Sequence, residues 1–214
     1  MIFILIGPPG AGKGTHSDAL LRDFPCTKIA TGDILRRHIK EGSSVGRRCE
    51  EIIGQGRLVD DATLWELLEP ELTKLKDKAV ILDGYPRNLA QATQLQEVVA
   101  SNPIRAVVYI EADDNTLMER LCGRMLCPNC QSIYHRKTRV PRQAGLCDNC
   151  QAPLVVRPDD ELEKVRTRLD IYAAETHPVV NYYQGLGLLK AVDGSQGIAA
   201  VYEQIKVMFR TKMV

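Results

Sequence analysis

Residues 2–15 of the chain read IFILIGPPGAGKGT, an apolar run of strand character followed at once by glycines and a lysine. Residues 7–13 fit the pattern G-x-x-x-x-G-K, and a helical pattern begins at Lys13. Between a strand and a helix, such glycines let successive backbone N–H groups point into one concavity at the positive end of the helix. The flanking elements favour this arrangement over an ordinary glycine turn. The stretch therefore predicts a phosphate-binding loop, with Lys13 reaching the β- and γ-phosphates of a nucleotide.

One position departs from that loop pattern. Gly14 stands where the pattern ends in Ser or Thr, and Thr15 follows one place later. This departure weakens the expectation that a hydroxyl of the loop ligates magnesium directly.

Apolar runs of strand character recur along the chain and alternate with segments of helical period. The runs are IFILI, TKIA, AVILD, AVVYIE and LLKAVD. Nearly all-apolar strands separated by helices predict an α/β fold with a parallel sheet covered on both faces. The predicted helices span residues 13–24, 34–41, 45–54, 61–76, 89–100, 115–124, 159–184 and 197–211. Two regions, roughly 30–59 and 123–160, interrupt the alternation.

Length and charge limit the classes of function. A chain of 214 residues can bury one core and carry a small inserted module. Because 28 Lys and Arg nearly balance 27 Asp and Glu, the overall charge gives no reason to expect nucleic acid or a membrane surface. No apolar run has the length of a membrane span, and residues 1–6 lack the basic start of a signal peptide. We therefore expect a cytoplasmic protein.

Four of the seven cysteines form two C-x-x-C pairs, Cys127 with Cys130 and Cys147 with Cys150. This spacing predicts a closed tetrahedral site of four thiolates for a structural Zn²⁺, with no open position at which the metal could activate water. Two disulfides or free thiols are disfavoured by the paired spacing and by the expected compartment. The other three cysteines, Cys26, Cys49 and Cys122, are expected to be reduced, partly buried thiols.

The basic residues between the two cysteine pairs raise an alternative function. Arg136, Lys137, Arg139 and Arg142 could let a zinc ribbon grip nucleic acid. Against this alternative, Tyr134 is the only aromatic residue there, which is poor provision for base stacking.

Several arginines fall at predicted strand ends or beside the cysteine segment, where the open edge of a parallel sheet places ligands. Arg120 and Arg124 are four residues apart in a predicted helix, so they are expected to share one face. A solvated basic face is the alternative for such a pair. Asp83 ends the third apolar run and suits the outer shell of a magnesium ion, the alternative being a cap of the following turn. The four histidines, His16, His38, His135 and His177, are expected at the surface or at caps, and none is proposed as a base. His177 directly precedes Pro178 and is expected at an irregularity of its helix.

Three further stretches give the chain a specific resemblance: ATGDILR at residues 30–36, DGYPR at 83–87 and RPDD at 157–160. With GPPGAGKGT, they closely resemble the adenylate kinases essentially from end to end, and the cysteine segment resembles the zinc-type lid of the long bacterial form. The resemblance implies a doubly wound, five-stranded parallel sheet and the reaction MgATP + AMP ⇌ MgADP + ADP. It implies a core at 1–29, 60–122 and 161–214, an AMP-binding insert at 30–59 and a lid at 123–160. A monomer is expected.

The resemblance also implies ligands for each substrate. ATP would be held by Gly10, Ala11, Gly12, Lys13, Gly14, Thr15, Arg120, Arg124, Ile133, Tyr134 and the backbone at Gln196. AMP would be held by Thr31, Arg36, Arg57, Leu58, Val59, Gly84, Tyr85, Pro86, Arg87 and Gln91. Arg157 and Arg168 would clamp the phosphates between the two nucleotides. Transfer itself would depend on Lys13, Arg87, Arg124, Arg157 and Arg168, with Asp83 near magnesium.

The chain departs from the family pattern at four places. Ala30, Tyr85, His16 and Gln131 stand where Ser, Phe, Gln and Gly are usual. None of these changes removes a charged group from the expected site. A kinase for UMP or CMP is the nearest alternative, and Thr31 and Gln91 favour AMP. A P-loop regulator whose zinc segment binds nucleic acid is the alternative outside enzymes.

Overall fold

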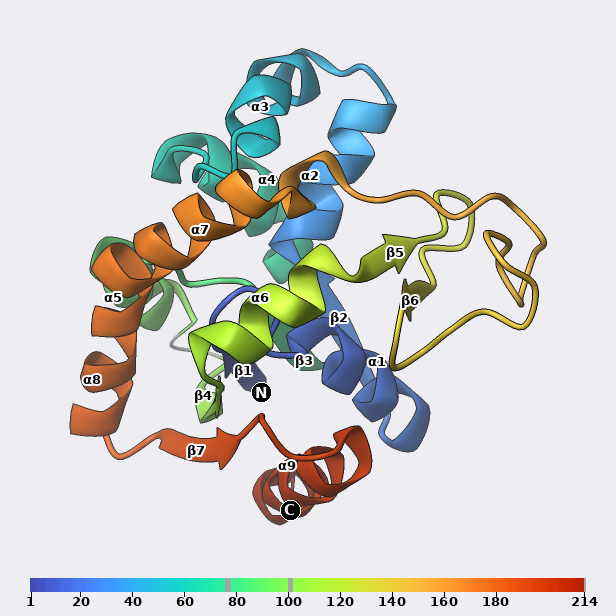
Figure 1. The fold of residues 1–214 in the computed structure, drawn as a ribbon. Coiled ribbons are helices and arrows are strands. Elements are labelled where there is room, and N and C mark those ends of the chain that lie inside the picture. Colours follow the sequence, from blue (N-terminus) through green and yellow to red (C-terminus); the bar gives the residue numbers. More distant parts are fainter. Residues whose placement is uncertain (76–77, 100–101, 214) are drawn as a thin grey trace.

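The sheet predicted from the apolar runs forms in the computed structural model, which describes residues 1–75, 78–99 and 102–213. Five strands pair in parallel in the order β2-β3-β1-β4-β7 (Figure 1). They are β1 (Ile2–Ile6), β2 (Cys26–Ala30), β3 (Ala79–Asp83), β4 (Ile104–Glu111) and β7 (Leu189–Asp193). The chain adds β2 and β3 on one side of β1 and then β4 and β7 on the other. The carboxyl end of β1 therefore lies where the strand order reverses, which is where such sheets bind ligands.

Alternate residues of β1 pack into separate cores on the two faces of the sheet. Ile4 is buried with Leu68 and Tyr183, whereas Phe3 is buried with Leu20 and Phe209. Each such fully buried side chain stabilises the fold by roughly 1.5–3 kcal/mol. The first core is covered by α4 (Asp61–Thr73), α5 (Leu89–Val98) and α8 (His177–Gly185). The second is covered by α1 (Lys13–Asp23), α6 (Asp114–Cys122) and α9 (Ile198–Met213). The predicted α/β fold, with helices on both faces, is confirmed.

Two segments project from this core, at the places where the alternation of strands and helices is interrupted. One consists of α2 (Thr31–Lys40) and α3 (Ser44–Gly54), which pack against each other. The other contains the antiparallel pair β5 (Arg124–Leu126) and β6 (Ile133–His135), followed by a long loop. Figure 1 shows α2 and α3 at the top of the view and the β5–β6 segment at the right. Among the described residues, the structure has no helix of the length and apolar character that a membrane span requires.

The helix predicted over residues 159–184 runs without interruption from residue 162 to residue 185, but its start and its winding differ from the prediction. The structure instead has a 3-10 turn at Pro158–Asp160, α7 at Leu162–Ile171, a π-helical turn at Tyr172–Thr176 and then α8. Pro178 has no N–H to continue the α-helical ladder, and the chain widens into a π turn just before it. The expectation that His177 lies at a helix irregularity is confirmed.

The ends of the predicted helices also differ. The ends at residues 76 and 100 lie outside the described residues; within them, α4 ends at Thr73 and α5 at Val98. The helix predicted over 115–124 ends earlier, because α6 stops at Cys122, Gly123 is its cap, and Arg124 begins β5. Arg120 and Arg124 therefore do not share a helix face, contrary to the prediction from their spacing.

Candidate active site and metal centre

The glycine loop closes tightly after β1. Gly10 and Gly12 have φ values of 86° and 96°, in the left-handed region that glycine adopts without strain. A Cβ on Gly7 would lie 2.4 Å from the carbonyl oxygen of Ile110, so a side chain there would collide with the backbone of β4. Lys13 Nζ donates hydrogen bonds to the carbonyl oxygens of Gly7 (2.7 Å) and Pro8 (2.9 Å). The lysine thus lies across the loop, at the start of α1, with its ammonium next to the space that a phosphate would fill.

Asp83 lies beside this loop, at the carboxyl end of β3. Its Oδ2 accepts a hydrogen bond from Ser17 Oγ at 3.4 Å, and the Ser17 hydroxyl also contacts the carbonyl oxygen of Gly14. Burial raises the pKa of Asp83, and the nearby Lys13 partly offsets that effect. Ser17 was not identified from the sequence. Its position one helical turn after Lys13, on the face toward β3, is the signal that could have found it.

The predicted AMP-side residues meet at the ends of β2 and β3. Gly84, with φ of 79°, offers its carbonyl oxygen to Thr31 Oγ1 (2.9 Å) and to Arg87 Nε (2.8 Å). The Arg87 backbone N–H donates to Gln91 Oε1 at 2.7 Å. Tyr85 is buried and precedes a cis peptide bond to Pro86. These residues come from different elements, and the structure brings them together around one turn.

Predicted ligands from the loop between α3 and α4 line a cavity next to this turn. The cavity has a volume of about 510 Å³, and Arg57, Leu58 and Val59 contribute to its wall. Asp61 at the start of α4 and Asn88, the N-cap of α5, also line the cavity. The other lining residues are Ile52, Asp60, Ile171 and Glu175.

Basic side chains converge on the space above the loop. Burial lowers the pKa of Lys13 to about 8, and Arg87, Arg168 and Arg124 lower it further, while Asp83 opposes the shift. Burial, with the repulsion of Arg168 among its other causes, lowers the pKa of Arg87 to about 10. Because each cation raises the free energy of the charged form of its neighbours, and Asp83 offsets only part of this for Lys13, the cluster favours binding of a further anion.

Arg157, which follows the four-cysteine segment, is likewise a buried cation beside other cations. Burial together with the charges of Arg36 and Arg124 lowers the pKa of Arg157 to about 9. The Nε atoms of Arg36 and Arg157 are buried and have no hydrogen-bond partner among the described residues. The Arg36 guanidinium pairs with Asp33 through Nη2, which leaves its Nε free. Free Nε donors beside other cations fit a group such as phosphate, which is acceptor-only and multiply charged.

One carboxylate holds two of these arginines in place. Asp160 accepts hydrogen bonds from Arg124 Nε (2.7 Å) and Nη2 (2.5 Å), and from Arg168 Nη1 (3.0 Å). Its side chain is 0% exposed, so the pair with Arg124 is shielded from water. The sequence motif contained Asp160, but the residue was not identified as part of the site, since its partner Arg124 lies 36 residues away along the chain.

Three predicted ATP ligands lie apart from the arginine cluster. Arg120 Nη2 donates to the carbonyl oxygen of Gly194 (2.8 Å), which places it beside Gln196 at the end of β7. The Tyr134 side chain is buried in the lid, where its hydroxyl accepts from Asp148 N–H at 2.8 Å. Only the backbone of Tyr134 therefore remains available to a nucleotide, and Ile133 precedes it in β6.

Two histidines differ from the sequence-based expectation of surface or cap positions. His16 is buried, and burial with the nearby Arg120 lowers its pKa to about 4, so it is neutral at physiological pH. His135 is also buried. Its Nδ1 accepts hydrogen bonds from the backbone N–H groups of Lys137 and Thr138, so its Nε2 carries the proton and donates to the carbonyl oxygen of Glu119. The His16 ring stacks against Tyr202, and the His135 ring caps the turn at residues 137–138.

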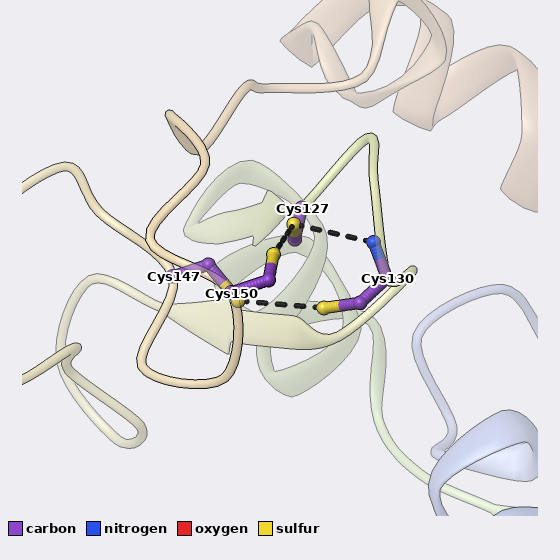
Figure 2. A group of neighbouring side chains, drawn as sticks. All are labelled: Cys127, Cys130, Cys147 and Cys150. Carbon is purple, nitrogen blue, oxygen red and sulfur yellow. Dashed lines mark hydrogen bonds between the residues drawn. The ribbon is translucent and has the colours of Figure 1, made fainter.

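The four predicted metal ligands form one compact group in the lid (Figure 2). The Sγ atoms of Cys127, Cys130, Cys147 and Cys150 all lie within 4.8 Å of one another. The Cys127–Cys150 and Cys130–Cys147 sulfur pairs are each 3.4 Å apart. A Zn²⁺ ion with four thiolates at about 2.3 Å has sulfurs about 3.8 Å apart, so the donor set fits zinc with little movement. Within the described ranges all seven cysteines are free, which excludes disulfides in this structure.

The two turns that carry these cysteines each contain a non-glycine residue with a left-handed backbone conformation. Gln131 and Gln151, each following the second cysteine of a pair, have φ values of 60° and 59°. Non-glycine residues occupy this region at a cost of about 1 kcal/mol. The departure from glycine at Gln131 is therefore tolerated by the fold but not favoured by the backbone.

Comparison with known proteins agrees with this geometry. A model of the family "Adenylate kinase" matches residues 5–188 of the chain. The chain is 40% identical over 209 residues to the adenylate kinase of Thermoanaerobacter sp. (strain X514), covering 96% of each protein. It is 38% identical over 213 residues to the adenylate kinase of Methanosarcina barkeri, covering 98% of this chain and 99% of the relative. With a glycine loop, an arginine cluster and a four-cysteine segment in one fold, and with matches over nearly its whole length, the chain belongs to the adenylate kinase family.

Proposed function

We propose that the chain transfers a phosphoryl group reversibly from MgATP to AMP, giving two molecules of ADP, and so balances the adenine nucleotides. The observation that carries this function is the convergence of four basic side chains, Lys13, Arg87, Arg124 and Arg168. The three arginines lower the pKa of Lys13, Arg168 also lowers that of Arg87, and Arg124 lowers that of Arg168. Such a cluster is stabilised by a polyanion, and two phosphate chains that meet end to end supply one.

Each substrate has its own part of the cleft in this proposal. The loop at residues 10–15 holds the ATP phosphates, and Arg120 with the backbone at Gln196 holds the adenosine end. The lid adds Arg124 and the backbone of residues 133–134. AMP occupies the other side, with Thr31, Arg36, Gly84–Arg87 and Gln91 near the turn after β3 and Arg57, Leu58 and Val59 in the cavity wall.

The transfer needs positioning and charge neutralisation more than proton transfer. The acceptor is a phosphate that is already ionised at neutral pH, so no general base is required. Lys13 and Arg87 neutralise charge that spreads over the moving group, while Arg157 and Arg168 hold donor and acceptor in line. Asp160 keeps Arg124 and Arg168 oriented for this role.

Both metal ions of the family fit residues of this chain. Asp83, with the Ser17 hydroxyl beside it, offers oxygen atoms to the water shell of the Mg²⁺ that accompanies ATP, an ion that neutralises phosphate charge. The four lid cysteines would hold a structural Zn²⁺, which stabilises a segment too short and polar to form its own core.

We propose that residues 123–160 act as the lid and residues 30–59 as the AMP-binding insert, with the core at 1–29, 60–122 and 161–214. Closure of the lid over bound substrates would exclude water that could otherwise take the phosphoryl group. We further propose that the chain works as a monomer in the cytoplasm, without nucleic acid or membrane as partners. Free cysteine thiols are in keeping with a reducing compartment.

Acceptor preference tests the function directly. In a coupled assay with MgATP, we expect kcat/KM for AMP to exceed that for GMP, CMP or UMP by about 10²-fold or more, because a base that mismatches the polar groups of the site leaves them unpaired. Comparable rates with CMP or UMP would contradict AMP specificity while leaving the kinase activity in place. No transfer to any of the four would contradict the proposed function.

Metal content tests the role of the lid cysteines. Purified protein is expected to contain about one equivalent of Zn²⁺, and Cys130→Ser is expected to reduce that content and lower the melting temperature, because zinc binding contributes to folding. Since the sheet does not depend on these residues, transfer should remain measurable well below the melting temperature. Cys26→Ser, which alters a thiol outside the lid, is the control. Immediate loss of transfer on chelation with magnesium restored and melting unchanged would contradict a structural role.

A further inference from the structure

A tight polar cluster lies at the edge of the cavity on the AMP side. Asp61, the first residue of α4, accepts a hydrogen bond from Gln91 Nε2 at 2.6 Å and two from Asn88 Nδ2, at 3.0 Å to each carboxylate oxygen. Asn88 Oδ1 in turn accepts from the Gln91 backbone N–H at 2.8 Å, as the N-cap of α5. Gln91 itself is 2% exposed, whereas Asp61 and Asn88 line the cavity.

The two partners of the Gln91 side chain fix which way its amide faces. The Arg87 backbone N–H can only donate, so it requires the amide oxygen, and it lies 2.7 Å from Oε1. The Asp61 carboxylate, when ionised, can only accept, so it requires the amide nitrogen. A flipped amide would set donor against donor at Arg87 and acceptor against acceptor at Asp61. The chemistry of these neighbours therefore determines the orientation.

With these bonds made, Gln91 retains one amide hydrogen and one lone pair of its oxygen. That remaining pattern is an acceptor next to a donor. Adenine presents the complement, a 6-amino donor beside a ring-nitrogen acceptor, and glutamine pairs with adenine in this two-bond manner. Hypoxanthine, the base of IMP, presents a 6-oxo acceptor beside an N1–H donor, which is the reverse pattern.

We propose that Asp61 is a positioning residue that determines base specificity, by holding the Gln91 amide in the orientation that accepts a 6-amino purine and rejects a 6-oxo purine. The inference rests on the proposed function, in which Gln91 contacts the base of the acceptor nucleotide. Asp61 acts through Gln91 and through Asn88, and it does not touch the phosphates or the reacting atoms.

The test compares AMP with IMP as acceptors, at saturating MgATP, in the wild type and in Asp61→Asn. In this variant, the Asn88 and Gln91 side-chain amides, which donate to the Asp61 carboxylate in the wild type, meet a neutral amide instead. Gln91 therefore loses a charged partner. We expect the AMP-to-IMP ratio of kcat/KM to fall about tenfold, mainly through a higher KM for AMP, with KM for ATP unchanged. Because both acceptors are measured in one preparation, the ratio does not depend on how much of the variant is folded.

Two further variants make the result decisive. Asp61→Ala removes the acceptor entirely and should lower the ratio at least as much. Asp114→Asn is the matched control: α6, like α4, begins after an N-cap aspartate with a second aspartate as its first residue, so this change removes the same charge from the same helix position away from the cavity. Its AMP-to-IMP ratio should equal that of the wild type.

Combining Asp61→Ala with Gln91→Ala separates an indirect role from a direct one. If Asp61 acts through Gln91, the double variant should discriminate no worse than Gln91→Ala alone. Additive losses would overturn the proposal, as would a ratio that changes less than about twofold in both Asp61 variants. A wild type that does not prefer AMP would instead contradict the proposed function, so the two failures can be told apart.

Discussion

Replacement of Lys13 by methionine is expected to lower kcat by about 10³-fold or more and to weaken ATP binding. The ammonium is the fixed cation inside the glycine loop, where it bonds the carbonyl oxygens of Gly7 and Pro8 and faces the outer phosphates in the proposed function. Methionine retains the length and apolar stem of lysine but offers no charge to the phosphoryl group as its negative charge develops. Steady-state kinetics with ATP and AMP measure the loss.

Folding should survive this change. Burial has already lowered the pKa of Lys13 to about 8, so its charge is costly to hold in the ligand-free protein. Its removal relieves repulsion from Arg87 and Arg168 but also takes a cation from the buried Asp83, and these two effects on stability oppose each other. Circular dichroism and thermal melting should therefore match the wild type. Lys190→Met, an exposed lysine of β7, is the control and should keep full activity. Near-normal turnover in Lys13→Met would contradict the assignment of residues 7–13 as a phosphate-binding loop.

Arg87→Ala should produce the second largest loss, about 10²- to 10³-fold in kcat/KM for AMP, while leaving stability unchanged or slightly higher. In the proposed function, the guanidinium neutralises phosphate charge between the two substrates. Without a ligand, burial and the charge of Arg168 lower its pKa to about 10, which means that its ionised form is destabilised where it stands. When a residue helps transfer but destabilises the ligand-free site, its removal should lower the activity of the protein without lowering its stability.

Kinetics and melting must be measured on the same preparation to support this reading. Arg105→Ala, which removes an exposed arginine of β4, serves as the matched control and should change neither quantity. A fall of several degrees in the melting temperature of Arg87→Ala, together with the loss of activity, would mean that the arginine is structural. In that case its bond to the carbonyl oxygen of Gly84 would be its main contribution.

Local patterns allowed much of the fold and one whole site to be predicted. The strands are apolar because both faces of the sheet are covered, so their runs could be read directly, and β1 and β3 have the predicted bounds. The metal site was equally readable, since two short C-x-x-C turns bring their sulfurs together within a few residues. The glycine loop was predictable because its φ values and its contact with Ile110 exclude other residues.

Features that depend on residues far apart in the sequence were decided only by tertiary structure. Their spacing predicted that Arg120 and Arg124 lie on one helix face, but α6 ends between them. Arg120 then donates a hydrogen bond to Gly194, whereas Arg124 donates to Asp160. Burial of His16 likewise depends on packing between elements that no local pattern encodes.

By itself, then, the sequence determined the five strands of the sheet, most helices, the geometry of the glycine loop and the cysteine cluster, because neighbouring residues specify turns and periodicity. The orientation of the Gln91 amide depended on its contact with Asp61, 30 residues away in the sequence. The pairing of Asp160 with two arginines depended on its contact with Arg124, 36 residues away. Hydrogen bonds and charges act over a few ångströms in space, so only the folded chain could decide which of these residues meet.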